Sequence, residues 1–479
     1  MVDIDVGPGS GGTGGASNGP GPGSGGTVNE GGMGTPGYVF DETYGGTGKI
    51  VAKDVALDGD GNIIVVGTFN GNVSFGGASD TGSGDDAFVA SYTSTGQYNW
   101  HVSAGDGAQQ VVNCVAIDSD NHIIIGGHVD GSMSWGKTNL GSLSQFADAY
   151  LAKLCATPDA SLGCSAGDGE EAWAEIFQLS SGKFHSSIGC GVDSSDNTYV
   201  TGFFQDQITL GGDTLTAIGG QSDWDVFLGK FSSTGAHLDS ESYGGTEPQY
   251  PEDLAVGADG SIAIVGYTLG DIKFDTNITN SMGERSFVAR LGPDFDHVFS
   301  KVHGGDDSNR ATAVAVADNG DTFVGGNFKN TIDLGAKSIT STTASDEPYV
   351  VRYGSDGTFD YGVGFTGQGI DRVNGIDVDS GGYAVIVGRT NADLIVHSQE
   401  TLQSAGLADA YAVRLGPPGN AFWGLSLGST SNDFGYAVAI DDANNVVMVG
   451  EFKGTVDFGG GDVSASNQDL FIVKYTSGD

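Results

Sequence analysis

Hydrophobic and polar positions along the chain follow a frame that recurs seven times. Each copy has an apolar segment, a turn rich in Asp and Gly, a second apolar segment and a glycine. The glycines that close the second segments lie 60 to 75 residues apart, at Gly67, Gly127, Gly202, Gly266, Gly326, Gly388 and Gly450. Because self-similarity at such a period is the signature of a repeat architecture, we predict one structural unit repeated along the chain.

Further positions recur at fixed offsets from these glycines. A third segment in each copy carries an aromatic residue, at Phe88, Tyr150, Phe227, Phe287, Tyr349, Tyr411 and Phe471. Three residues later, six copies carry a basic residue, at Lys153, Lys230, Arg290, Arg352, Arg414 and Lys474. We expect each basic side chain to pair with a turn aspartate of its own or a neighbouring unit, because a buried charge needs a partner.

Each copy predicts a small antiparallel sheet. In the first, the strands are expected at Val51–Leu57, Asn62–Gly67, Ala87–Tyr92 and Tyr98–Ala104, with turn chemistry between them. These segments are apolar on both faces, so each sheet needs a neighbour on both sides. Stacking around a central axis provides this, which predicts an all-β β-propeller of four-stranded antiparallel blades.

The two ends of the chain fit together in this scheme. The last copy stops after its third strand, Leu470–Tyr475, and Tyr38–Gly45 resembles the fourth strands of other copies. We therefore predict that the N-terminal strand pairs with the C-terminal blade and closes a seven-bladed ring, which removes exposed sheet edges.

The sequence divides into two parts. Residues 1–36 are Gly, Ser, Pro and Thr with few apolar residues, which is typical of a disordered tether. Residues 37–479 form the predicted propeller. A GxGxxG match at Gly7–Gly12 lacks the flanking strand and helix of a dinucleotide site and carries no weight.

The repeat resembles the bacterial β-propeller family called SBBP. The matching features are Asp58, Gly61 with Asn62, Gly67, Asp148-Ala149-Tyr150 with Lys153, and Trp100. The resemblance implies a secreted or surface-attached bacterial protein and no catalytic residues, because the shared positions are structural. The fourth copy departs from the pattern, with Gly257 and Arg285 where aspartates are expected.

The charge narrows the choice of partners. The chain has 61 acidic and 19 basic residues, a net charge of −42, which argues against nucleic acid and anionic membrane surfaces. The acidic residues either solvate the surface or bind divalent cations at the turns. Asp58 and Asp60, and Asp118 and Asp120, resemble half of a calcium loop but lack its distal Glu. Calcium is therefore the one cofactor that the sequence suggests, and the alternative is that these aspartates are ordinary turn residues.

The cysteines bear on the compartment. Cys155 and Cys164 bracket an insertion in the second copy, so we predict a disulfide and an exported protein. Cys114 and Cys190 occupy non-equivalent positions of neighbouring first strands and are expected to be buried free thiols. The start of the chain does not read as a signal peptide, and no segment is apolar enough to insert into a membrane. The Gly-rich leader resembles that of a lipoprotein, without the N-terminal Cys.

Catalytic motifs are weak. Gly-x-Ser-x-Gly occurs at Gly163–Gly167 and Gly424–Gly428, but neither place predicts the strand-to-helix turn of a nucleophile elbow. His122 and His128 lack metal-site spacing and are expected at strand edges or turns. A third group, Trp100, Trp173 and Trp423, is expected in the core between blades.

Function is expected on the face formed by the loops that follow the second strands. These loops are polar and differ between copies, at Gly76–Asp85, Gly136–Ala147, Gly211–Asp223 and Lys337–Asp346. We predict a secreted or cell-surface binding or scaffold module, non-catalytic, with a protein or glycan ligand on this face. Two alternatives stay open: an extracellular polysaccharide-active enzyme with its site at the mouth of the central channel, and a structural subunit of a surface layer or filament.

Overall fold

The computed structural model describes residues 35–478, apart from 143–145, 180–182, 221–222, 275–276, 279–282, 306, 342 and 398–399. The predicted tether, residues 1–36, lies outside the described residues except for its last two positions. The described residues form strands, turns and bends and contain no helix. Within this part of the chain there is accordingly no helix that could span a membrane.

The strands associate in sets of four consecutive antiparallel strands. Sheet 1 contains β2 (Lys49–Leu57), β3 (Ile63–Ser74), β4 (Ser79–Tyr92) and β5 (Tyr98–Ala104); sheet 2 contains β6 (Gln110–Ile117), β7 (Ile123–Val129), β10 (Asp148–Cys155) and β11 (Glu170–Phe177); sheet 3 contains β12 (Ser186–Val192), β13 (Thr198–Gln205), β16 (Trp224–Phe231) and β17 (His237–Tyr243). Sheet 4 contains β18 (Gln249–Val256), β19 (Ile262–Thr268), β22 (Arg285–Leu291) and β23 (His297–Gly305); sheet 5 contains β24 (Asn309–Val316), β25 (Thr322–Phe328), β28 (Glu347–Tyr353) and β29 (Phe359–Gly364); sheet 6 contains β31 (Arg372–Val378), β32 (Ala384–Thr390), β35 (Asp409–Gly416) and β36 (Asn420–Leu427).

Sheet 7 combines the two ends of the described chain. It contains β37 (Phe434–Ile440), β38 (Val446–Asp457) and β39 (Asp462–Tyr475), and its fourth strand is β1 (Tyr38–Tyr44). β1 runs antiparallel to β39, with Tyr44 opposite Leu470 and Tyr38 opposite Tyr475.

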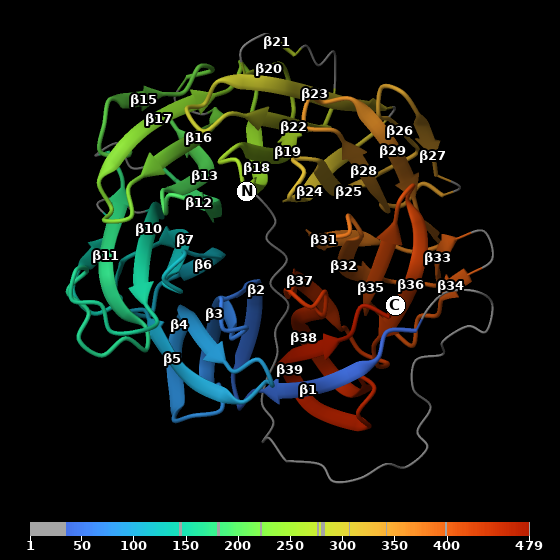
Figure 1. The fold of residues 1–479 in the computed structure, drawn as a ribbon, viewed down its shortest axis with the longest axis horizontal. Coiled ribbons are helices and arrows are strands. Elements are labelled where there is room, and N and C mark those ends of the chain that lie inside the picture. The colour runs from blue at the N-terminus through green and yellow to red at the C-terminus, as the bar shows by residue number, and fades with distance from the viewer. Residues whose placement is uncertain are drawn as a thin grey trace.

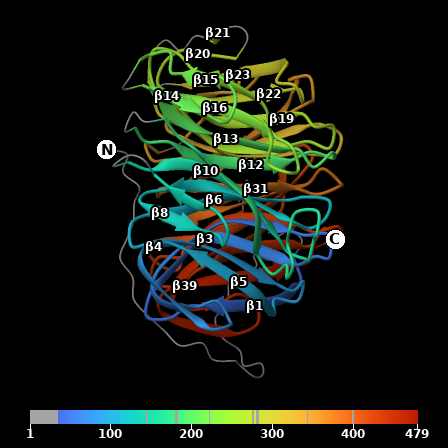
Figure 2. The same cartoon turned by 90° about the vertical axis from the view of Figure 1, so that its left-hand side faces the viewer.

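The sheets follow one another around a central axis (Figure 1), and the side view shows them stacked as successive layers of the ring (Figure 2). A cavity of about 390 Å³ on the axis is lined by residues of the first strand of all seven sheets. Four-stranded antiparallel sheets set radially around a channel define a β-propeller, so the predicted all-β propeller class is confirmed.

Short hairpins, rather than plain loops, connect the second and third strands. Sheets 2 to 6 carry the pairs β8 (Ser132–Ser134) with β9 (Asn139–Gly141), β14 (Gln207–Thr209) with β15 (Thr214–Thr216), β20 (Ile272–Lys273) with β21 (Asn277–Ile278), β26 (Thr331–Asp333) with β27 (Ser338–Thr340), and β33 (Leu394–His397) with β34 (Glu400–Leu402). In sheets 1 and 7 the hairpin is the prolonged end of the long strands. β30 (Thr366–Gly367) pairs with β33. Apolar residues six and eight positions after each repeat glycine anchor these hairpins. In sheet 1 they are the fully buried Val73 and Phe75.

The repeat glycines are explained by a β-bulge in every first strand. Between the first and second strands of each sheet the register shifts at one residue: Lys53, Asn113, Ile188, Glu252, Thr312, Asn374 and Tyr436. The carbonyl oxygen two residues before each bulge lies against the repeat glycine of the second strand. A Cβ added to any of the seven glycines would lie 1.8–2.2 Å from that oxygen. No side chain fits there, so the bulge demands glycine at this position.

The aromatic residue of the third strand covers the same glycine. A Cβ on Gly326 would lie 2.6 Å from the Tyr349 ring, and one on Gly450 would lie 2.6 Å from the Phe471 ring. In two sheets the phenol also binds the carbonyl itself, since the hydroxyl of Tyr411 donates to Arg372 O at 3.0 Å. The aromatic ring thus fills the space left by the missing side chain.

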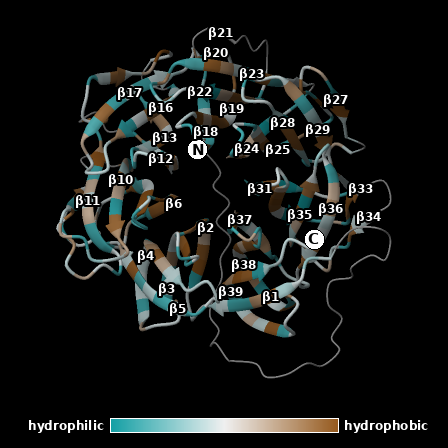
Figure 3. Ribbon diagram, viewed as in Figure 1, coloured by the Kyte–Doolittle hydropathy of each residue, from teal (hydrophilic) through white to brown (hydrophobic). Residues whose placement is uncertain are grey.

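Apolar residues pack between neighbouring sheets. One cluster joins Ile64 and Val66 of sheet 1 to Ile123, Ile125 and Tyr150 of sheet 2, all of them buried. The strands therefore carry apolar residues on both faces, and hydrophobic colour follows the strands in Figure 3. Trp423 is fully buried, and Trp100 and Trp173 pack against such clusters, as expected for core residues.

Two disulfides are present, one of them against expectation. Cys155 and Cys164 are bonded, which confirms the prediction. The expectation of free thiols at Cys114 and Cys190 is wrong, because these residues form a disulfide between the first strands of sheets 2 and 3.

The one-residue difference in their positions is what brings Cys114 and Cys190 together. Neighbouring first strands meet with a diagonal offset of one residue. Asp54 lies one residue after the bulge of sheet 1, and it accepts a hydrogen bond at 2.8 Å from Val115 N, which lies two residues after the bulge of sheet 2. Cys190 is likewise one position further along its strand than Cys114, counted from the bulge. Equivalent positions would not have faced each other.

The bulge predicts which glycines tolerate a methyl group. Gly388→Ala places a Cβ 1.8 Å from Arg372 O, so the backbone must shift. We expect a loss of about 3 kcal/mol in the free energy of unfolding, the upper range for overpacking. Gly141→Ala is the matched control, because nothing lies within 4 Å of its Cβ position. Urea denaturation of both variants measures the difference, and equal stability would contradict the steric explanation.

Candidate functional site

The turn aspartates proposed as metal ligands use their oxygens within the protein. Asp58 Oδ1 accepts hydrogen bonds from Asp60 N at 2.9 Å and Asn62 N at 2.8 Å, and Asp58 Oδ2 accepts from Asn62 Nδ2 at 2.8 Å. Asp60 Oδ2 accepts from Asn121 Nδ2 of the next sheet at 3.2 Å. These contacts build the turn and tie it to its neighbour.

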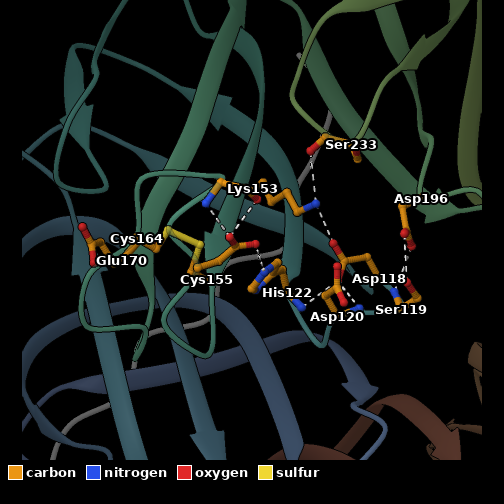
Figure 4. Close-up of polar contacts among 12 residues, drawn as sticks. Asp118, Ser119, Asp120, His122, Lys153, Cys155, Cys164, Glu170, Asp196 and Ser233 are labelled. Atoms are coloured by element: carbon orange, nitrogen blue, oxygen red, sulfur yellow. Dashed lines mark hydrogen bonds and ion pairs between the residues drawn. A yellow bond between two sulfur atoms is a disulfide. The ribbon is translucent and has the colours of Figure 1, made fainter.

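The second candidate turn contains the predicted pairing of a basic side chain with an aspartate. Asp118 Oδ1 accepts from Asp120 N and His122 N, and Asp118 Oδ2 lies 2.5 Å from Lys153 Nζ. Lys153 also donates to Ser233 O of sheet 3 at 3.1 Å, so the lysine bridges two sheets (Figure 4). Arg414 with Asp379 at 2.5 Å and Lys474 with Asp441 at 2.8 Å repeat the pairing.

The calcium hypothesis therefore stays a prediction. Over the described part of the chain, no group of three or more His, Cys, Asp or Glu side chains is placed to hold a metal ion. His122 and His128, expected at strand edges or turns, are both buried. The serines of the two Gly-x-Ser-x-Gly matches lie apart, Ser165 in the segment after the Cys164 bridge and Ser426 in β36.

The structure assembles a different candidate site at the entrance of the axial channel on the hairpin side. The residue after each repeat glycine and its partner on the first strand form one rim pair per sheet. The seven rim pairs are Thr68 with Val51, His128 with Val111, Phe203 with Ser186, Tyr267 with Tyr250, Asn327 with Arg310, Arg389 with Arg372, and Glu451 with Phe434. We call these pairs, with the bulge residues beneath them, the channel mouth.

One side of the channel mouth is a cavity of about 330 Å³. It is lined by the rim pairs of sheets 6, 7, 1 and 2 and by the bulge residues Lys53, Asn113, Asn374 and Tyr436. Four of the chain's 19 basic residues face it: Lys49, Lys53, Arg372 and Arg389. Two carboxylates, Asp85 and Glu451, also line the wall. Burial lowers the pKa of the Lys53 ammonium, an effect that Glu451 and Asp85 oppose and the nearby Lys49 adds to.

The other side of the channel mouth is a continuous row of aromatic rings, which we call the aromatic row. It consists of Phe184, Phe203, Trp224, Tyr250 and Tyr267 of sheets 3 and 4. Consecutive ring centroids lie 5.8, 5.1, 6.1 and 4.9 Å apart. The first four side chains are only half-buried.

Polar groups stand at both ends of the aromatic row. His128, which also lines the cavity, lies 5.4 Å from the Phe184 ring between centroids. At the far end the Arg310 guanidinium lies 4.2 Å above the Tyr267 ring and donates to Glu284 at 2.7 and 3.0 Å. The row and the cavity therefore form one continuous surface around the channel.

Carboxylates lie deeper in the channel. Burial raises the pKa of Glu252, the bulge residue of sheet 4, to about 7, and that of Asp253 to about 8. Burial also raises the pKa of Asp54 to about 7, although Asp54 and Asp253 each accept two backbone hydrogen bonds that favour the charged form. Three buried histidines shift the opposite way, since burial lowers the pKa of His128, His185 and His303 to about 4.

The sequence indicated the mouth of the channel only as the place of an alternative enzyme site, and its residues were not identified although a signal was present. Within a frame that repeats closely, the position after the glycine holds Thr, His, Phe, Tyr, Asn, Arg and Glu in turn. Because the rest of the frame is nearly constant, the chemical variation at this position indicates that the repeat does not fix its side chain. Its direction toward the axis depends on the bulge, which the sequence did not reveal.

Comparisons with known proteins give limited similarity. No family model matches the chain. Regulatory protein FlaEY of Caulobacter vibrioides is 30% identical over 190 residues, which is 37% of this chain and 20% of that protein. The chain therefore matches about a fifth of the length of that curated relative.

Solved structures match over most of the chain at low identity. A protein of unknown function from Dyadobacter fermentans is 11% identical, with a TM-score of 0.38 over 93% of this chain and 98% of that one. A gluconolactonase from Xanthomonas campestris is 11% identical, with a TM-score of 0.32 over 74% and 90% of the two chains.

The pKa shifts predict how stability depends on pH above the histidine range. A carboxyl whose folded pKa is raised from about 4 binds more protons when folded, so its stabilising effect is lost as pH rises through the folded pKa. Between pH 7 and 9 the unfolded histidines, with a pKa of about 6.5, are mostly neutral, as are the buried His128, His185 and His303 of the folded protein. The carboxyls with a pKa of about 7 or 8, Glu252, Asp54, Asp253 and Asp469, therefore dominate. We expect the Tm to fall by a few degrees over this window in 1 M NaCl, which screens surface repulsion.

The variant Glu252→Gln tests whether Glu252 contributes to this fall in Tm. The amide cannot titrate, so the variant should lose less Tm than the wild type between pH 7 and 9. Differential scanning calorimetry at both pH values measures this. A wild-type Tm that is constant or rises with pH would contradict the raised carboxyl pKa values.

Proposed function

We propose that the chain is a closed, seven-bladed β-propeller of the SBBP type that acts as a secreted or cell-surface binding module, with its ligand at the channel mouth. Several features support closure of the ring. β1 supplies the fourth strand of sheet 7, and the pairing continues beyond the strands, where Thr476 N donates to Gly37 O at 2.8 Å. The first strands of all seven sheets line the same axial cavity.

Export is supported by the two disulfides, of which one joins neighbouring sheets. Disulfides persist in oxidising compartments and are rare in the reducing cytosol. The large acidic excess fits a protein that must stay soluble without binding nucleic acid.

The observation that carries the binding function is the composition of the channel mouth. The frame fixes the backbone of seven equivalent positions and leaves their side chains to vary. Those side chains form a cationic cavity and an aromatic row on a rigid ring, which is the usual composition of a ligand site: apolar and aromatic walls with a few placed polar groups.

A second candidate function, an enzyme acting on polysaccharides, is favoured by one residue. Glu252 lies at the bulge of sheet 4, two residues after Tyr250 of the aromatic row, and has a pKa of about 7. A carboxyl that titrates near neutral pH can serve as a general acid or base. We favour binding because a single carboxyl with a near-neutral pKa does not by itself make the acid and base pair that glycan cleavage needs.

Ring closure is tested by two truncations. Deleting residues 1–46 removes β1 and exposes the edge of β39, whereas deleting residues 1–35 leaves β1 intact. We expect a sharply lower Tm and aggregation for the longer deletion, and a Tm close to that of the full chain for the shorter one. Equal Tm values for the two truncations would contradict closure by β1.

The binding function is tested with an array of glycans and peptides. Ligands bound by the full chain should be lost in the double variant Lys53→Met with Arg389→Leu, while its Tm stays near that of the wild type. Mass spectrometry of each bound ligand after incubation should show it unchanged. Binding that is unchanged in the double variant would contradict a site at the channel mouth. Turnover of a ligand that disappears in Glu252→Gln would favour the enzyme instead.

A further inference from the structure

The aromatic row is not required by the repeat. The rim position after the glycine is Phe203 in sheet 3 and Tyr267 in sheet 4, but Thr68 and Asn327 serve the same position in sheets 1 and 5. A polar residue thus satisfies the frame equally well. Four of the five aromatic side chains are only half-buried, so the row keeps part of its apolar surface exposed.

The cavity beside the row contains buried polar atoms without a partner. His128, Glu451 and Gln468 line it and are only 5%, 2% and 8% exposed, and each has one such atom: His128 Nε2, Glu451 Oε2 and Gln468 Oε1. None of the three atoms has a hydrogen-bond partner among the described residues. Because buried polar groups are nearly always satisfied, these atoms point to a ligand with several hydrogen-bonding groups of its own.

The charges of the cavity indicate that this ligand carries an anion. Lys49, Lys53 and Arg389 line the cavity, and the Arg389 guanidinium lies 5.0 Å from the Phe434 ring centroid. The rest of the chain is strongly acidic, with a net charge of −42. At physiological ionic strength charges beyond about 8 Å are largely screened, so an anion in the cavity interacts mainly with the charges of the lining, where four basic residues outnumber the carboxylates of Asp85 and Glu451.

A hydroxylated chain molecule with flat apolar faces and a carboxylate satisfies all three conditions. Sugar rings present C–H faces that pack on aromatic rings, and their hydroxyl groups donate to acceptors such as Glu451 Oε2 and Gln468 Oε1. We propose that the ligand of the channel mouth is an acidic oligosaccharide, whose sugar rings lie on the aromatic row and whose carboxylate enters the cavity beside Lys53 and Arg389. The proposal rests on the binding function proposed for this site.

The test compares uronate tetrasaccharides with their methyl esters. Tetramers of galacturonate, mannuronate and guluronate are titrated into the full chain by isothermal titration calorimetry, each beside its fully methyl-esterified form. The ester keeps the sugar and removes the charge. We expect at least one free acid to bind, and its methyl ester to bind at least tenfold more weakly.

Three variants locate the binding. Lys53→Met removes a cavity cation, and Phe184→Ala removes a ring that precedes β12 and so lies outside the strands. Each should weaken binding of the free acid at least tenfold. Lys137→Met is the matched control, because this lysine lies between β8 and β9 of an outer hairpin and its side chain is 41% exposed. It should bind as the wild type does.

The outcomes separate this proposal from the one it rests on. If ester and acid bind equally well and both depend on Lys53 and Phe184, the acidic specificity is overturned while the binding function remains. Binding of the acid that is unchanged in both variants overturns the assigned site. If none of the tetrasaccharides binds although the array finds another ligand at the channel mouth, the ligand class is overturned.

Discussion

The contact between a bulged first strand and the glycine of the second strand underlies the whole structure. Each bulge turns a carbonyl onto the neighbouring strand, where a Cβ would lie about 2 Å from it, so the position must be glycine. The aromatic residue of the third strand then covers the gap. One local irregularity therefore couples three strands of every sheet. The bulge also turns one residue per sheet out of the ladder, and four of these residues line the cavity of the channel mouth.

This coupling divides the positions of the repeat into those that the fold requires and those whose side chains can vary. Glycine, aromatic ring, turn aspartate and basic partner build the sheet and link it to its neighbours, as Lys153 does between Asp118 and Ser233. The rim pairs are not fixed by the repeat, and those that link sheets do so through different contacts, as His128 does with Ser186 and Asn327 with Val373 N. Their seven different chemistries give one ring a cationic side and an aromatic side, so specificity is obtained by changing side chains on a constant backbone. Asp54, Asp253 and the Cys114 to Cys190 disulfide join first strands beneath the mouth and hold that backbone in place.

The sequence predicted the fold well because its signals were local and repeated. Strand order, the pairing of Lys153 with Asp118 and the Cys155 to Cys164 bond all follow from short spacings. Contacts between different sheets were harder to predict from the sequence. The Cys114 to Cys190 bond was missed because it depends on a diagonal offset between neighbouring strands, which only the packed ring sets. The candidate site was missed for the same reason: Trp224, Lys53 and Arg389 are distant in sequence and meet only around the axis.

A crystal structure of the full chain grown with a uronate tetrasaccharide tests the account most directly. The account predicts electron density for sugar rings over Phe203 and Trp224, and a carboxylate within ion-pair distance of Lys53 or Arg389. It also predicts that hydroxyl groups occupy the positions facing Glu451 Oε2 and Gln468 Oε1. A channel mouth that holds only water at saturating ligand, or a sugar bound on the outer hairpins, would contradict it.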